Sequence, residues 1–321
     1  MKQTQPTIGL VSTSYSLSFI DERLRKIGME TLNKLGFNYE VGKNAYKTID
    51  YIAGTLDERV QDFTGFLKDS AVDIIMSVIG GYNSNQLLPH LDYDLIAEIG
   101  KKIVGFSDTT ALLNAIYTKT GRVTYLGPSF VTFCNPCLYS ETVEYFFRVI
   151  VQGEDNVSYI PPKRYAYDDW FLKENFGPRE EFSHKGWNFV REGVGKGILV
   201  GGNLETFLSL AGTEYLPDME GKVLLIEGNV NEKPAYVDRQ LHQLEQMHVF
   251  DKIEGLIVGQ YGNSFYESEM FFRLLRNVTG KKKVPIVVDA EFSHVDPIYT
   301  IPIGGTVLLN SQNKEITLLK Q

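Results

Sequence analysis

The stretch from Lys102 to Leu113 places a serine where a short apolar run ends and a helix begins. It reads Lys-Ile-Val-Gly-Phe-Ser-Asp-Thr-Thr-Ala-Leu-Leu. This order sets the hydroxyl of Ser107 at the carboxyl end of a strand, beside the partly positive start of a helix. We predict that Ser107 is a nucleophile, although Thr109 stands where the G-x-S-x-G motif has its second glycine. The alternative is that Ser107 and Asp108 only cap the helix.

A serine hydroxyl needs a base to take its proton, and the base needs an acid to orient it. The candidate base is His294, in a loop directly after an apolar strand, and the candidate acid is Glu227, which closes the apolar run 223–226. A carboxylate at the end of a buried strand is costly unless it has a partner. The chain order Ser, Glu, His is that of α/β-hydrolases. Alternatively, His294 bonds to backbone and Glu227 forms a surface pair with Lys233 or Arg239.

Two glycine pairs, Gly80-Gly81 and Gly201-Gly202, follow predicted strands. Glycines at a strand end let backbone amides approach a substrate oxygen, as an oxyanion hole requires. The alternative for both pairs is a plain turn, with Asn203 capping the helix after the second one. The chain has no Gly-Lys-Ser/Thr, which excludes a phosphate-binding P-loop.

The two cysteines, Cys134 and Cys137, form a single C-x-x-C. A zinc site would need two further ligands, and no Cys or His lies near this pair in the sequence. We interpret both as reduced thiols without a role of their own and predict no metal site.

Composition limits the class of protein. The chain has 321 residues, 43% hydrophobic and 22% charged, with a formal net charge of -8. This length suffices for two domains, and the negative charge argues against nucleic acid or an anionic membrane as partner. No apolar run approaches the roughly 20 residues of a membrane-spanning helix, and the first residues lack a secretory core. We therefore expect a cytoplasmic protein.

Apolar strands alternate with amphipathic helices in both halves, which predicts an α/β fold with a mostly parallel sheet covered by helices on both faces. We expect an N-terminal domain over 1–150 that carries the nucleophile and a smaller C-terminal α/β domain over 191–321 that carries Glu227 and His294. The connection 151–190 is rich in aromatic residues, which favours a lid or binding loop. The predicted strands are 7–12, 38–41, 72–79, 103–106, 123–126, 197–200, 222–226, 255–258, 285–288, 306–309 and 315–319. The predicted helices are 21–35, 56–68, 93–99, 109–119, 203–210, 236–247 and 267–278.

Four segments, 80–89, 105–112, 201–204 and 302–305, resemble the LD-carboxypeptidase family of serine peptidases in the order expected along the chain. Within that family the sequence is more similar to the microcin C self-immunity branch than to the muropeptide branch. Muropeptide enzymes typically carry an arginine before the Gly-Gly, where this chain has Ile79. The run Asn83-Ser84-Asn85 and the aromatic connection with Trp170 are more typical of the immunity branch.

The resemblance implies a flavodoxin- or amidotransferase-like N-terminal sheet and a triad of Ser107, Glu227 and His294 at the domain interface. It also implies an oxyanion hole from the backbone amide of Asp108 and that of Gly80 or Gly81. The resemblance implies no metal or organic cofactor, and it implies a homodimer. The resemblance further indicates substrate contacts, namely a base-stacking tryptophan and two asparagines; the candidates are Trp170, with Trp187 second, and Asn83 and Asn203.

Three functions follow from these expectations. The first is a serine hydrolase that cleaves the amide between an aminoacyl or peptidyl group and a modified nucleotide, as in self-immunity to microcin C-like toxins. The alternative is a muropeptide LD-carboxypeptidase that releases terminal D-alanine during peptidoglycan recycling. The third is a ligand-binding protein without catalysis, against which the intact set of Ser107, Glu227 and His294 argues.

Overall fold

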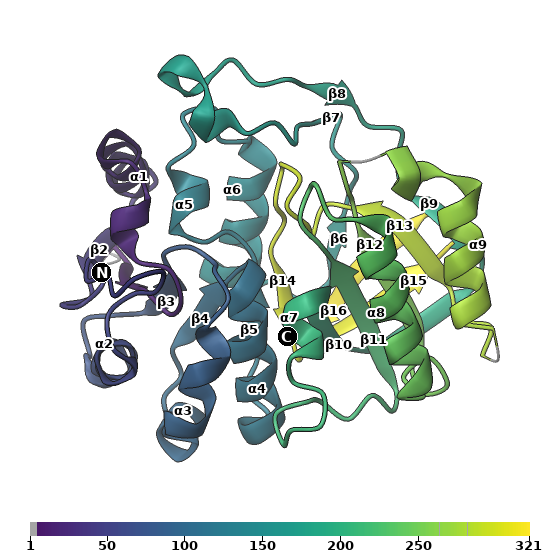
Figure 1. Cartoon of the computed structure of the whole chain (residues 1–321), viewed down its shortest axis with the longest axis horizontal. Coiled ribbons are helices and arrows are strands. Elements are labelled where there is room, and N and C mark those ends of the chain that lie inside the picture. The colour runs from purple at the N-terminus through teal and green to yellow at the C-terminus, as the bar shows by residue number, and fades with distance from the viewer. Residues whose placement is uncertain (1–4, 263, 281) are drawn as a thin grey trace.

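Two β-sheets lie next to each other in the protein, whose computed structural model describes residues 5–262, 264–280 and 282–321. The N-terminal half forms the first sheet and its helices, and the C-terminal half forms most of the second sheet (Figure 1). The predicted α/β class is therefore confirmed. The helices are α1 (Glu22–Lys34), α2 (Leu56–Lys68), α3 (Tyr93–Glu98), α4 (Thr110–Thr120), α5 (Phe130–Phe133), α6 (Ser140–Phe146), α7 (Leu204–Leu208), α8 (Pro234–Gln246) and α9 (Glu269–Val278).

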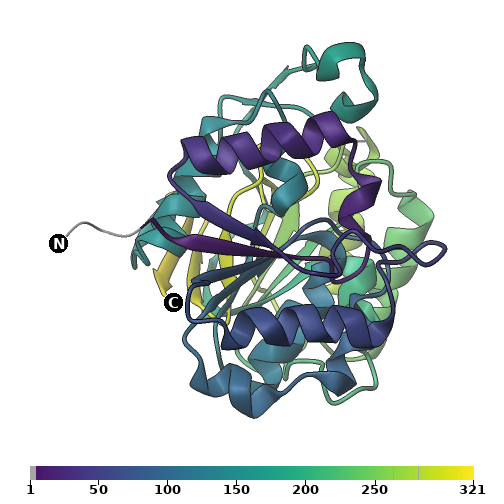
Figure 2. The same cartoon turned by 90° about the vertical axis from the view of Figure 1, so that its left-hand side faces the viewer.

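The first sheet has the strand order β14-β5-β4-β3-β1-β2, in which every neighbour pair is parallel except β14 with β5. Its strands are β1 (Thr7–Val11), β2 (Asn38–Val41), β3 (Ile74–Ser77), β4 (Lys102–Gly105), β5 (Thr124–Leu126) and β14 (Ile301–Ile303). Figure 2 shows α1 on one face of this sheet and α2 on the other. Helices on both faces bury the strands, which is why β3 and β4 are almost purely apolar.

The second sheet has the order β6-β16-β15-β10-β11-β12-β13-β9, and its centre from β10 to β13 is parallel. Its strands are β6 (Val157–Tyr159), β9 (Asn188–Arg191), β10 (Val194–Asn203), β11 (Lys222–Glu227), β12 (Gly255–Gly259), β13 (Ile286–Ala290), β15 (Thr306–Asn310) and β16 (Glu315–Lys320). Because the strands of each parallel core point the same way, their carboxyl ends gather at one edge. Ligands of α/β proteins usually bind at this edge.

Two strands pair with sheets that are built mainly from other parts of the chain. Strand β14, from the C-terminal half, pairs with β5 of the first sheet, and β6, from the connection, pairs with β16 of the second. The sequence predicts neither strand, because each forms by pairing with a segment that is distant along the chain. The domain boundaries expected at residues 150 and 190 stay predictions.

The connection 151–190 contains regular structure in place of the expected loop. Besides β6 and β9, it forms a small hairpin of β7 (Arg164–Tyr165) and β8 (Phe182–Ser183). The rings of Tyr165, Tyr167 and Phe182 stack on one another in this hairpin. The segment crosses above both sheets in Figure 1, so it can cover a site that lies between them. Among the helices formed by the described residues, none is long and apolar enough to cross a membrane.

Candidate active site

Ser107 has a backbone conformation that residues with a side chain rarely adopt. It follows β4 directly and has φ 57°, in the left-handed region. Such a conformation persists only where the surroundings impose it, and it is frequent at functional sites. The side chain of neither Ser107 nor Asp108 caps α4, whose N-cap is Thr109 without a side-chain hydrogen bond. The alternative of simple helix capping therefore does not explain these two residues.

The Gly80-Gly81 turn after β3 lies against Ser107. A Cβ atom on Gly80 would come within 2.8 Å of the Cβ and 2.9 Å of the Oγ of Ser107. Gly81 has φ 145°, and a Cβ there would collide with Ser14. Glycine is thus required on steric grounds, and the backbone of this turn runs beside the candidate nucleophile.

The carboxylate of Asp108 joins this turn to the segment that carries Ser107. It accepts hydrogen bonds from the backbone amides of Asn83, at 3.0 Å, and Ser84, at 2.8 Å, while Ser84 Oγ donates to the carbonyl of Asp108. Asp108 is 4% exposed. Sequence reasoning missed this function of the side chain, because a carboxylate at a helix start equally suggests a cap.

Glu227 and His294 form a close pair. Nδ1 of His294 lies 2.6 Å from Oε2 of Glu227, which is fully buried at the end of β11. Burial acts to lower the pKa of His294, but the charge and hydrogen bond of Glu227 outweigh it and raise that pKa above its ordinary value. Lys233 and Arg239, the other candidate partners of Glu227, lie over the ring of Tyr236 instead.

Ser107 and His294 line the same pocket, a cavity of about 740 Å³ between the two halves of the chain. The ring of Phe106, next to the serine, packs 4.7 Å from the ring of His294. Gly80, Gly81 and Asp108 also line this pocket, while Glu227 lies behind His294. The structure thus brings the serine, the histidine and the candidate oxyanion amides to one cavity.

Of the four residues predicted to contact substrate, two line the pocket and two are not among its described lining residues. Trp170 and Asn203 line the pocket, and Trp170 is only 9% exposed. Trp187 is buried elsewhere and donates its Nε1 hydrogen to Glu291 at 2.8 Å, so it belongs to the core. Asn83 is not among the described residues that line the cavity; Asn85 is.

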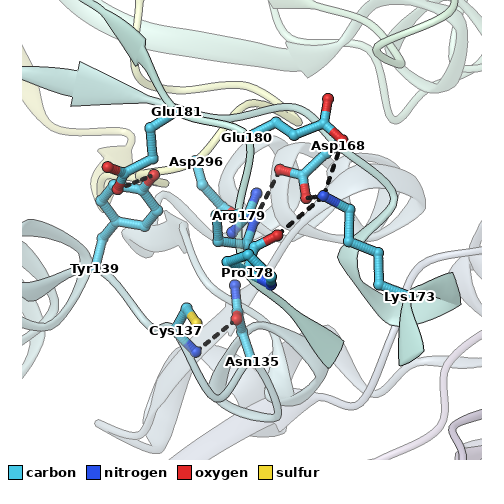
Figure 3. A network of polar contacts seen from close by, with 10 residues as sticks. All are labelled: Asn135, Cys137, Tyr139, Asp168, Lys173, Pro178, Arg179, Glu180, Glu181 and Asp296. Atoms are coloured by element: carbon cyan, nitrogen blue, oxygen red, sulfur yellow. Dashed lines mark hydrogen bonds and ion pairs between the residues drawn. The ribbon is translucent and has the colours of Figure 1, made fainter. Parts of the chain in front are cut away.

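Arg179 ties the connection to the loop that carries His294. Its Nε lies 2.9 Å from Oδ1 of Asp168, and its Nη1 lies 2.8 Å from Oδ2 of Asp296 (Figure 3). Asp168 precedes Trp170 by two residues, and Asp296 follows His294 by two. The backbones of Ala166 and Asp296 also exchange two hydrogen bonds of 2.9 Å. The aromatic segment and the histidine loop are therefore held as one unit.

The two cysteines take no part in this site. Cys134 is buried, Cys137 is exposed, and both are free thiols. Burial raises the pKa of Cys134 far above its usual range, which makes its thiol unreactive. Within the described ranges, no group of three or more His, Cys, Asp or Glu side chains could hold a metal ion.

The family profiles of known proteins match both halves of the chain. The LD-carboxypeptidase N-terminal domain matches residues 8–127, and the LD-carboxypeptidase C-terminal domain matches residues 196–309. The chain belongs to the LD-carboxypeptidase family. The microcin C7 self-immunity protein MccF of Escherichia coli is 33% identical to it over 98% of this chain and 93% of MccF. A probable murein peptide carboxypeptidase of Bacillus subtilis (strain 168) is 28% identical over 88% of this chain and 83% of that protein.

Solved structures of MccF-like proteins have the same fold throughout. The MccF-like protein of Bacillus anthracis superposes with a TM-score of 0.93 at 32% identity, over 99% of this chain and 98% of the other. MccF in complex with aspartyl sulfamoyl adenosine gives 0.91 at 32% identity, over 99% and 97%. MccF has also been solved as an active-site mutant in which a serine, an asparagine and a lysine are replaced by alanine, again with a TM-score of 0.91. The chain is thus an MccF-like member of the carboxypeptidase family.

Proposed function

We propose that the protein is a serine hydrolase that cleaves the amide bond between an aminoacyl or peptidyl group and a modified nucleotide. The observation that carries this proposal is the wall of the pocket that holds Ser107 and His294. Six aromatic residues line it: Tyr15, Phe19, Tyr82, Phe106, Trp170 and Phe171. Aromatic faces stack on nucleobases of any sequence, and the cavity has room for a nucleoside with its acyl group. Binding of aspartyl sulfamoyl adenosine by MccF supports the same substrate class.

The proposed reaction is acyl transfer through Ser107. The Nδ1 hydrogen of His294 is donated to Glu227, which leaves Nε2 to accept the serine proton. The serine oxygen attacks the amide carbonyl, and the amides of Asp108 and of Gly80 or Gly81 bind the oxyanion. His294 then gives the proton to the leaving amine. Water next loses a proton to His294 and attacks the acyl-serine ester, and His294 returns that proton to the oxygen of Ser107 as the acid is released.

The second candidate, a muropeptide LD-carboxypeptidase, is favoured by the similarity to the murein peptide carboxypeptidase. Its substrate ends in a free carboxylate, for which a lysine or arginine is the natural partner. Among the described residues that line the cavity there is neither, and one of them is Ile79, at the position where the muropeptide branch typically has arginine. The pocket therefore supports the nucleotide substrate better.

Mass spectrometry of the purified protein tests the proposal. The wild type and the Ser107→Ala variant each receive aspartyl sulfamoyl adenosine and a murein tetrapeptide, in separate reactions. We expect release of the amino acid from the nucleoside by the wild type, and a loss of at least about 1000-fold in Ser107→Ala, since removal of a triad member typically costs more than this. Circular dichroism of both proteins controls for folding. Release of D-alanine alone would identify a muropeptide enzyme, and undiminished turnover in Ser107→Ala would exclude the triad.

A further inference from the structure

We propose that this pocket selects a neutral or basic amino-acid residue at the cleaved amide over an acidic one, and that Glu205 determines this selectivity. The inference rests on the proposed function, because it concerns the acyl part of the same substrate. It does not follow from the MccF relatives, since MccF has been solved with aspartyl and with glutamyl sulfamoyl compounds.

The aromatic rings of Tyr, Phe and Trp that line the pocket come from the N-terminal half and the connection, whereas α7 contributes none. The aromatic ones belong to the connection and to the loops after β1 and β3, together with Phe106. The polar lining residues of the C-terminal half are Asn203, Glu205, Thr206 and Ser209, in α7 or directly beside it, Asn229 after β11, and His294 and Asp296 of the histidine loop. In Figure 1, α7 lies low between the two sheets, whereas the connection crosses the top. With the base on the aromatic side and the cleaved amide at Ser107, the acyl group extends toward α7.

The first turn of α7 is fixed beside the candidate nucleophile. The backbone amide of Asn203 donates to Oγ1 of Thr110, at 3.0 Å, and Thr110 is the first residue of the helix that follows Ser107. Asn203 is also aligned with Glu227 in the pairing of β10 with β11. Glu205 follows two residues later, so its carboxylate projects from an anchored turn into the cavity.

Of the four carboxylates that line the pocket, Glu205 is the one without a hydrogen-bond or ion-pair partner among the described residues, so its charge can interact with a ligand. The other three have partners: Asp21 accepts from the amide of Arg23, Asp108 from the amides described above, and Asp296 pairs with Arg179. In the described parts of the chain, the hydrogen bond of Glu205 to Ser209 uses its backbone carbonyl, and its carboxylate makes no ion pair or hydrogen bond. Glu205 is exposed and lines the cavity, so a substrate group can reach it.

The described lining residues offer no lysine or arginine to balance this charge. The active-site mutant of MccF, in contrast, replaces a serine, an asparagine and a lysine. The present pocket has a serine and an asparagine, Ser107 and Asn203, but no such cation. An acidic acyl side chain would be desolvated next to a like charge, whereas a lysyl or ornithyl side chain would pair with Glu205. Selection against one class by repulsion is as effective as attraction of another.

The experiment compares aspartyl, alanyl and lysyl sulfamoyl adenosine in the full-length protein. We expect kcat/KM for the lysyl and alanyl compounds to exceed that for the aspartyl compound by at least about tenfold, which corresponds to one well-placed charge contact. The variant Glu205→Gln keeps the shape and removes the charge, so the lysyl-to-aspartyl ratio should fall about tenfold. The matched control Glu220→Gln removes the same charge from an exposed position outside the pocket and should leave the ratio unchanged.

Calorimetric binding of the three compounds to Ser107→Ala separates this inference from the proposed function. If none is cleaved by the wild type but the lysyl compound binds most tightly to the variant, the proposed hydrolysis fails and the selectivity stands. Tightest binding or fastest cleavage of the aspartyl compound, or an unchanged ratio in Glu205→Gln, would overturn the selectivity alone. Binding of none of them would overturn both.

Discussion

At the residue scale, three side chains far apart in the sequence acquire chemistry from their surroundings. Ser107 has positive φ and lies beside the Gly80-Gly81 turn, where a Cβ atom on Gly80 would clash with the serine and one on Gly81 with Ser14. His294 gains a proton acceptor in Glu227, which is itself removed from water at the end of β11. A buried carboxylate beside an imidazole stabilises the protonated ring, and this stabilisation sets the pH at which the proposed base can work.

The raised pKa of His294 predicts where activity is lost in acid. Only the neutral imidazole can take the serine proton, so kcat/KM should fall as the pH drops through the raised pKa. The acidic limb of the profile is then expected above 6.5, the ordinary value for histidine. Glu227→Gln removes the charge that raises this pKa. The limb should therefore move to lower pH, while the plateau falls by about 10⁴-fold, as for comparable triad variants.

Measurement of kcat/KM between pH 5 and 9 checks this prediction, with a substrate that does not titrate in that range. His242→Gln serves as control, because His242 is half-exposed and lies on α8 away from the pocket. A limb that stays in place in Glu227→Gln would show that His294 is not the titrating group.

At the element scale, the connection joins the wall of the pocket to the loop that carries His294. Arg179, whose side chain is 4% exposed, ties Asp168 of the connection to Asp296 of the histidine loop. Lys173 adds ion pairs to Asp168 and Glu180. Because the connection also carries Trp170, the position of the tryptophan depends on the same contacts that hold the loop of His294.

Trp170→Ala should weaken nucleotide substrates far more than plain peptides. Stacking of a base on an aromatic side chain is worth about 1–3 kcal/mol, so kcat/KM for the nucleoside compound should fall roughly 5- to 150-fold. Trp170→Phe keeps a ring in the same place and should recover most of the loss, which a purely structural defect would not predict. Parallel assays with a nucleoside and a peptide substrate provide the measurement. Equal losses on both would remove the stacking function.

At the scale of the whole molecule, the site exists only because the two halves of the chain are pinned together. Asn114 on α4 makes three buried hydrogen bonds. Its Nδ2 donates to the carbonyls of Thr110 and Gly201, both at 2.8 Å, and its Oδ1 accepts from the amide of Gly201 at 2.9 Å. These bonds join the helix that follows Ser107 to the strand that ends at Asn203. Strand β14 provides a second link, because it pairs with β5 across the halves.

Asn114→Ala should lower both stability and activity. It leaves the amide and carbonyl of Gly201 without their partner in a buried place, which costs roughly 2–4 kcal/mol of unfolding free energy. Chemical denaturation and kcat/KM measure the two effects. Thr118→Val, one turn along α4, removes a single hydrogen bond to the helix backbone and should cost less than about 1.5 kcal/mol with little loss of activity. Equal activity in both variants would contradict a pinning function for Asn114.

Much of this arrangement is local and could be predicted from the sequence. The period of apolar residues places α1, α2 and the parallel strands within a few residues of their observed bounds, because each buries its own stripe against a neighbour. Ser107, Glu227 and His294 are recognisable because each follows an apolar strand, and parallel strands bring their carboxyl ends to one edge. The glycine pairs are equally visible, since close backbone approach requires them.

The tertiary structure decided the contacts between segments that are distant along the chain. The sequence alone left Glu227 with three possible partners, His294, Lys233 and Arg239, and 67 residues separate it from the histidine it pairs with. Of the two tryptophans, burial of the indole nitrogen against Glu291 assigns Trp187 to the core and leaves Trp170 in the pocket. Strands β6 and β14 form because a distant edge receives them. Local propensity cannot encode such choices, since their energy comes from surfaces that meet only after the chain has folded.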